Sequence, residues 1–119
     1  EEAINSLEES RDKDGKWRSF VNQTLDQNYR SIFQTLDCLI MLKAPSFDCV
    51  FQWRQEQETK LAESLGSDAD KSQLMNFEEL HQFILGYERI TRHTLQTMPQ
   101  FADAVFFLDE HRRIVRRQN

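Results

Sequence analysis

The stretch Leu36-Asp-Cys-Leu-Ile-Met-Leu-Lys-Ala-Pro45 decides the fold class of this chain. Its residues from Cys38 to Leu42 form a continuous apolar run, and Pro45 ends the run. A short apolar run without polar interruption is typical of a strand that is buried on both faces, as strands of parallel sheets are. We therefore predict a buried parallel strand at this position.

Two helices and a second strand are predicted to follow. Ser46 is placed to cap a helix that leaves the first strand. Asn76-Phe-Glu-Glu79 has the spacing of a capping box, and apolar residues then recur at helical steps over about 76–97. Ala104-Val-Phe-Phe-Leu108 is a second short apolar run. This order of strand, helix, loop, long helix and strand is the connectivity of a crossover between parallel strands.

The flanking segments give weaker signals. Residues 1–15 predict a loop or a short helix, and the apolar spacing after Lys16 predicts one bent helix or two short ones. Residues 64–75 are predicted to be a mobile loop. After a turn at Asp109-Glu-His111, Ile114-Val115 is predicted to pair back. We thus expect an α/β fold with two short parallel strands and three to four helices, forming part of one domain over residues 1–119.

Two parallel strands are too few for a stable sheet, because such sheets need neighbouring strands and cover on both faces. The first residue is Glu rather than Met. We therefore expect a fragment or a processed chain. The missing strands would come from an N-terminal part of an enzyme, or the unit is mainly helical and is completed by a partner.

Composition excludes several classes of function. The 119 residues include 15 Lys+Arg and 20 Asp+Glu, which gives a formal net charge of -5 and argues against nucleic-acid binding. There is no apolar run long enough to cross a membrane and no signal-peptide pattern at the start. Neither Cys38 nor Cys49 has a metal-ligand or disulfide-scaffold setting. We expect reduced, mostly buried thiols in a cytoplasmic protein.

Arg54 is the first candidate site residue. It lies two turns into the helix that leaves the first strand, and ligands of open α/β sheets gather at the carboxyl ends of strands. Its planar guanidinium suits phosphoryl oxygens. The pattern alone favours the other interpretation, a solvated Arg that lies over a Trp on the helix surface.

A second candidate group lies on the long helix. Arg89, Arg92 and His93 are spaced so that they can line one side, where they would hold a phosphate or a carboxylate. Against this, Glu88 is placed to pair with Arg92, and a charged stripe opposite an apolar one is typical of any surface helix. The pattern alone therefore favours an ordinary helix surface. The segment His111-Arg-Arg-Ile-Val-Arg-Arg117 is also basic, and it is typical of a solvated tail or a charge-protected edge strand.

The sequence lacks the common catalytic signatures. Its three His residues are dispersed, so we expect no protein-bound metal. It contains no Gly-x-Ser-x-Gly elbow and no phosphate-binding loop of the form Gly-x-x-x-x-Gly-Lys-Ser/Thr. Hydrolase chemistry has no support, and these residues alone cannot cradle a nucleoside triphosphate.

Four stretches resemble the C-terminal half of D-glycerate 3-kinase and its P-loop relatives in the phosphoribulokinase and uridine kinase superfamily. The match covers nearly the whole chain in the same order. The four stretches are Asp14-Gly-Lys-Trp-Arg-Ser-Phe-Val-Asn22, Leu42-Lys-Ala-Pro-Ser-Phe-Asp48 with Gln52-Trp-Arg-Gln-Glu-Gln-Glu58, Phe83-Ile-Leu-Gly-Tyr-Glu-Arg-Ile-Thr-Arg-His93, and Met98-Pro-Gln-Phe-Ala-Asp-Ala-Val105.

The resemblance implies an ATP-dependent kinase that phosphorylates a hydroxyl of D-glycerate, with Mg²⁺ bridging the phosphates. It implies that Arg54 is a lid arginine near ATP phosphates, and that Arg89, Arg92 and His93 lie near the acceptor and the lid. ATP and Mg²⁺ would be held mainly by an N-terminal half that contains the phosphate loop. The isolated fragment would then be inactive, because lid residues act on phosphates that the loop has already placed.

Two alternatives stay open. The acceptor of such a kinase could instead be another small hydroxy acid, a pantothenate-like compound or a nucleoside, because the acceptor pocket is shared with the absent half. The chain could also be a non-catalytic helical module whose exposed apolar surface docks a protein partner.

Overall fold

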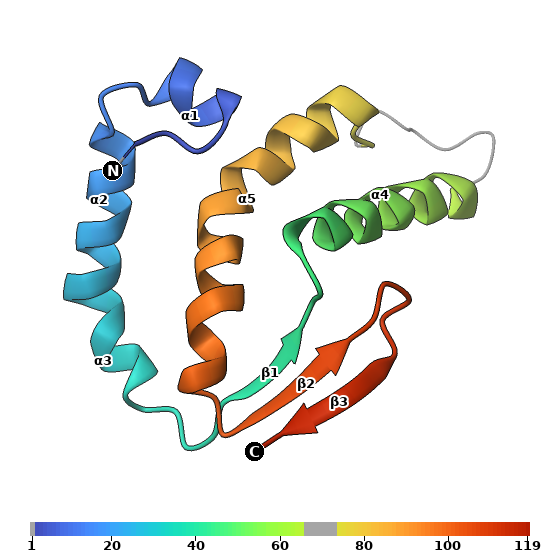
Figure 1. Cartoon of the computed structure of the whole chain (residues 1–119). Helices are drawn as coiled ribbons and strands as arrows, with labels where there is room; N and C mark the ends of the chain where they lie inside the picture. The colour runs from blue at the N-terminus through green and yellow to red at the C-terminus, as the bar shows by residue number, and fades with distance from the viewer. Residues whose placement is uncertain (1, 66–73) are drawn as a thin grey trace.

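The computed structural model of the chain describes residues 2–65 and 74–119, and it has a mixed α/β fold (Figure 1). The predicted mobile loop at 64–75 lies largely outside the described residues. The elements, in chain order, are α1 (Ser6–Arg11), α2 (Lys16–Thr24), the π-helical segment η1 (Leu25–Tyr29), α3 (Arg30–Phe33), β1 (Ile40–Lys43), α4 (Phe47–Ser64), α5 (Phe77–Thr97), the 3-10 turn η2 (Met98–Gln100), β2 (Ala104–Leu108) and β3 (Ile114–Gln118).

The sheet has the order β1-β2-β3. β1 and β2 are parallel, with Ile40 opposite Ala104, and the α4–α5 pair forms the crossover between them (Figure 1). β3 is antiparallel to β2 and closes a hairpin. The predicted strands, crossover and returning segment are therefore confirmed, and β3 adds an antiparallel strand to the expected parallel pair.

The prediction that β1 is buried on both faces is wrong for this chain. Met41 on β1 is buried, but Ile40 and Leu42 are 60% and 64% exposed. Alternate residues of a strand point to opposite faces of the sheet, so the described residues cover only one face of β1. The apolar run correctly indicates a strand with two apolar faces. The described residues pack against only one of these faces.

Local capping fixes where the two long helices begin. The Ser46 hydroxyl accepts the Cys49 backbone N–H at 3.3 Å at the start of α4. At the start of α5, Asn76 and Glu79 form both hydrogen bonds of a capping box. Each interaction satisfies a backbone N–H that the first helical turn leaves without an intrahelical partner. The predicted starts of both helices are confirmed.

The main apolar core lies between α4 and α5. Phe47 of α4 packs with Leu80 and Ile84 of α5, and Phe51 completes the contact. Phe51 also meets the Phe77 ring edge-on, with ring centroids 5.8 Å apart. Burial of these side chains is the dominant favourable term that holds the helix pair together.

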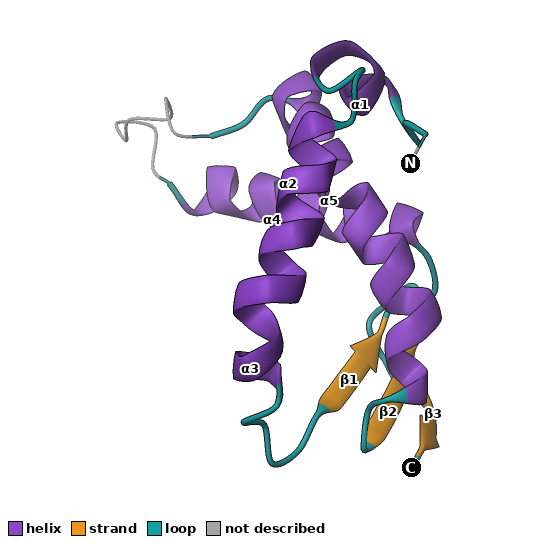
Figure 2. Cartoon of the chain, turned by 90° about the vertical axis from the view of Figure 1, so that its left-hand side faces the viewer, coloured by secondary structure: helices purple, strands orange, loops and turns teal. Residues whose placement is uncertain are grey.

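The segment α2–η1–α3 forms a helical arm that runs alongside α5 but is separated from it (Figures 1 and 2). It is one helix with a π-helical interruption, in agreement with the predicted bent helix. Several large apolar side chains on and just after this arm are exposed: Trp17, Phe20, Tyr29, Ile32, Phe33 and Leu36. The arm thus contributes little apolar burial to the core.

None of the helices described in the structure is both long and apolar enough to cross a membrane.

We predict that Leu80→Ala lowers the free energy of unfolding by about 3 kcal/mol, because it removes a side chain that is only 2% exposed and leaves a cavity between α4 and α5. Urea-induced unfolding measures the change. Leu61→Ala is the matched control, since Leu61 is 47% exposed, and it should cost less than about 1 kcal/mol. Equal losses in the two variants would show that the core does not lie where the structure has it.

Candidate functional site

A depression of about 450 Å³ lies beside α4 at the carboxyl edge of the sheet. Because β1 and β2 are parallel, they end at the same edge, where α4 follows β1 and the β2–β3 turn follows β2 (Figure 1). This is the edge at which open α/β sheets bind ligands. The depression is lined by Val50, Trp53, Arg54, Glu56, Gln57, Lys60 and Arg112.

The β2–β3 turn brings Arg112 to this depression. Asp109 organises the turn, because its carboxylate accepts the backbone N–H groups of His111 and Arg113. Arg112 has a φ of 63°, and its N–H donates to the Asp109 carbonyl oxygen. A type I turn followed by a left-handed residue is a common three-residue hairpin loop, and glycine usually takes the left-handed position.

Trp53 and Glu56 fasten this turn to α4. The Trp53 indole Nε1 donates to the Glu110 carbonyl oxygen at 2.7 Å. The Arg112 guanidinium lies 5.7 Å from the centroid of the Trp53 ring and forms an ion pair with Glu56. The turn therefore sits against the middle of α4 through polar and cation–π contacts.

Three cations and two carboxylates set the charge of the site. Arg54 pairs with Glu58 at 2.6 Å, and Lys60 pairs with Glu56 at 2.6 Å. The hydrogen bond from Lys60, followed by the one from Arg112, holds the pKa of Glu56 below its ordinary value. Lys60 and Arg112 thus share one carboxylate, and the group as a whole keeps an excess of one positive charge.

This arrangement suits the binding of an anion. Guanidinium and ammonium groups from two elements converge beside an indole, and they are the side chains that bind phosphoryl and carboxylate oxygens in proteins. The residues that the structure describes include no group of three or more His, Cys, Asp or Glu side chains placed to hold a metal ion. The donor set of the depression therefore fits phosphate oxygens and does not fit Mg²⁺.

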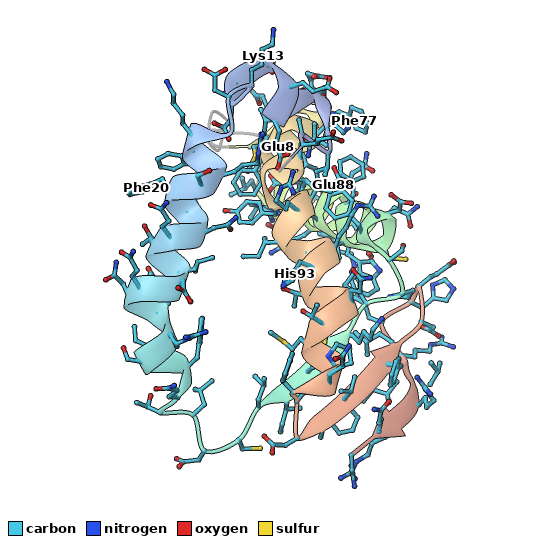
Figure 3. The ribbon with its side chains drawn as sticks, turned by 60° about the vertical axis from the view of Figure 1, so that its left-hand side comes forward. Glu8, Lys13, Phe20, Phe77, Glu88 and His93 are labelled. Atoms are coloured by element: carbon cyan, nitrogen blue, oxygen red, sulfur yellow. The ribbon has the colours of Figure 1, made fainter. Side chains whose placement is uncertain are left out.

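The other candidate residues lie on α5 with different neighbours. Arg89 makes a two-pronged contact with Glu8 of α1, at 2.9 and 2.7 Å. Arg92 donates to Glu88 at 2.8 Å and lies over the Phe47 ring. His93 is exposed and sits nearer the sheet along α5, whereas Glu8 and Glu88 lie toward the α1 end (Figure 3). Arg89 and Arg92 therefore bind different carboxylates and do not converge on one ligand position.

These contacts belong to a polar network that fastens α1 and α2 to α5. The Asn5 amide donates to Glu88 and to the Leu85 carbonyl oxygen, both at 3.0 Å. Arg18 of α2 is buried and pairs with both Glu8 and Asp12. The hydrogen bond from Arg89 is the largest influence that lowers the pKa of Glu8, and it outweighs desolvation. Joining the N-terminal helices to α5 is a structural role that is sufficient to explain this network.

Among the predicted site residues, then, only Arg54 lines the depression. Lys60, Trp53 and Arg112 line it too, and the sequence alone does not predict them as site residues. One signal was present, because Glu56 and Lys60 have the spacing of a helical ion pair. The basic segment at 111–117 was the other signal, although its pattern favoured a solvated tail.

Comparisons with known proteins give no relatives: no family profile, no curated protein and no solved structure matches this chain.

We predict that Glu8→Gln lowers the free energy of unfolding by about 1–3 kcal/mol near neutral pH, because it removes the negative charge that pairs with Arg89 and Arg18. The pKa of Glu8 is lowered on folding, so its contribution is present above its ordinary value of 4.5 and is lost as the pH falls toward the folded value. Denaturant unfolding between pH 7 and pH 3 should therefore show a shallower acid dependence in Glu8→Gln than in the parent protein. Parallel pH profiles would show that the pair contributes nothing.

Proposed function

We propose that this chain forms the phosphate-facing lid part of an ATP-dependent small-metabolite kinase, with D-glycerate as the acceptor. The observation that carries the proposal is the position of Arg54 in a basic depression at the carboxyl edge of two parallel strands. In phosphoryl transfer, positively charged side chains stabilise the charge on the transferred group, and the protein contributes mainly positioning and electrostatics. The choice of D-glycerate rests on the sequence resemblance alone.

The proposed roles follow from the contacts of each residue. Arg54 is half-buried and lines the depression, and its guanidinium is held by Glu58 and Gln57. It would bind phosphoryl oxygens of ATP. Arg92, His93 and Arg89 remain candidates for the acceptor side, although the ion pairs of both arginines would have to open for such a role.

The proposal requires a phosphate loop from another segment of polypeptide. The 119 residues contain no such loop, and the described residues have no carboxylate group arranged for Mg²⁺. When bound, MgATP supplies the phosphoryl group, and an N-terminal half would hold it. The 119-residue chain by itself would be inactive. We also propose a cytoplasmic location, where both cysteines would stay as free thiols. Cys49 is buried as expected, whereas the expected burial is wrong for Cys38, which is exposed.

A second candidate function is a non-catalytic interaction module. The observation that favours it is the exposed apolar surface of the α2–α3 arm, which includes Trp17 and Phe20, and of β1, which includes Ile40 and Leu42. Exposed apolar patches are typical of docking surfaces for other polypeptide. A kinase completed by its own N-terminal half also requires docking, so enzymatic activity separates the two candidates.

We predict that Arg54→Ala lowers kcat for ATP-dependent phosphorylation of D-glycerate by at least about tenfold in the complete protein that carries this chain, because one phosphate-directed charge is lost. ADP release, measured with D-glycerate present and absent, gives the rate.

Arg30→Ala is the matched control, because Arg30 forms an exposed helical ion pair with Asp26 and does not line the depression. Its kcat should stay within about twofold of the parent value. Absence of any D-glycerate-dependent ADP release from the complete protein would contradict the kinase proposal. Equal kcat values for Arg54→Ala and Arg30→Ala would show that Arg54 does not act in the phosphate site.

A further inference from the structure

We infer that Arg112 is a second anion-binding residue of the depression, and that Glu56 occupies the place of two phosphoryl oxygens of a bound polyphosphate. This inference deepens the proposed function and rests on it for the choice of a polyphosphate as the ligand class. It names a residue on the β2–β3 turn and a carboxylate on α4 that the kinase resemblance does not assign.

The backbone of Arg112 gives the first argument. Its φ of 63° is one that glycine adopts freely and that other residues adopt at a cost of roughly 1 kcal/mol. A non-glycine residue persists at such a position where the surrounding structure holds it there. Here the side chain lines the depression, lies over Trp53 and reaches Glu56. The hairpin therefore holds Arg112 in a strained backbone conformation, and the Arg112 side chain lines the same depression as Arg54.

The contacts of Glu56 give the second argument. Its Oε1 lies 2.6 Å from Lys60 Nζ, while its Oε2 pairs with Arg112 Nη2. Two oxygens of one anionic group thus bridge two cations from different elements. Two oxygens of a phosphate would satisfy the same two cations, and Arg54 in the same depression could bind a third.

Exchange of the carboxylate for a ligand is inexpensive at this position. Glu56, Lys60 and Arg112 are 42%, 66% and 44% exposed, and exposed ion pairs contribute little free energy. A polyphosphate carries more negative charge than one carboxylate and therefore competes well for the cations. Glu56 would then turn toward solvent, because it is exposed on α4 and needs no other partner to stay hydrated.

The test is equilibrium binding of inorganic tripolyphosphate to the complete protein, measured by calorimetry at fixed ionic strength. Arg112→Asn removes the charge but keeps a residue that tolerates positive φ. It should weaken binding roughly tenfold, the effect expected from loss of one charge-assisted contact. Arg30→Asn makes the same change in charge away from the depression and should leave binding within about twofold. Far-UV circular dichroism confirms that each variant is folded.

Glu56→Gln gives the sharper result, because the two readings of Glu56 predict opposite signs. If Glu56 competes with the ligand, Glu56→Gln should tighten tripolyphosphate binding by about threefold or more. If Glu56 only fastens the turn to α4, its loss should leave binding unchanged or weaken it. Asp26→Asn is the control, since it removes a carboxylate from an exposed helical pair elsewhere and should not change affinity.

The outcomes separate this inference from the kinase proposal. Suppose that the protein shows D-glycerate-dependent ADP release, but that neither Arg112→Asn nor Glu56→Gln changes tripolyphosphate binding. This result would overturn the inference and leave the kinase proposal standing. Tripolyphosphate binding that responds to both variants in a protein without kinase activity would support the anion site and overturn the kinase proposal. A parent protein that does not bind tripolyphosphate overturns the inference.

Discussion

The parallel pairing of β1 and β2 is the constraint on which the rest of the structure depends. Two parallel neighbours cannot be joined by a tight turn, so the chain must cross over, and it does so through α4 and α5. The same pairing makes both strands end at one edge. α4 leaves β1 at that edge, and the β2–β3 turn contacts the middle of α4, so the depression with Arg54 and Arg112 lies where they meet.

Local signals were enough to predict most of the elements. Ser46 and the Asn76–Glu79 capping box mark helix starts because a side chain must satisfy the first free N–H groups, whatever the rest of the chain does. Burial is different, because it depends on what covers each face. The run around Ile40 and Leu42 correctly predicts a strand, but the prediction that both faces are packed fails since the described residues cover only one.

The site was predictable only in part, for a related physical reason. Arg54 lies on α4, the helix that directly follows β1 in the chain. Its position near the carboxyl edge of the sheet can therefore be inferred from the order of the elements. Arg112 reaches that place through a pairing between β2 and β3 and a contact with Glu56, which is 56 residues away in the chain. Likewise, helical spacing put Arg89 and Arg92 on one side, but Glu8, 81 residues from Arg89, draws that arginine toward α1.

If the depression at the carboxyl edge binds the phosphates of ATP, as we propose, the two indoles of the chain should respond differently to ATP. Trp53 lines this depression, whereas Trp17 lines a separate hollow between α1 and α2. In a ¹⁵N-labelled complete protein titrated with ATP, we predict a saturable shift of the Trp53 indole N–H resonance, assigned with a Trp53→Phe variant, and none for Trp17. A shift confined to Trp17, or no shift of either indole, would contradict it.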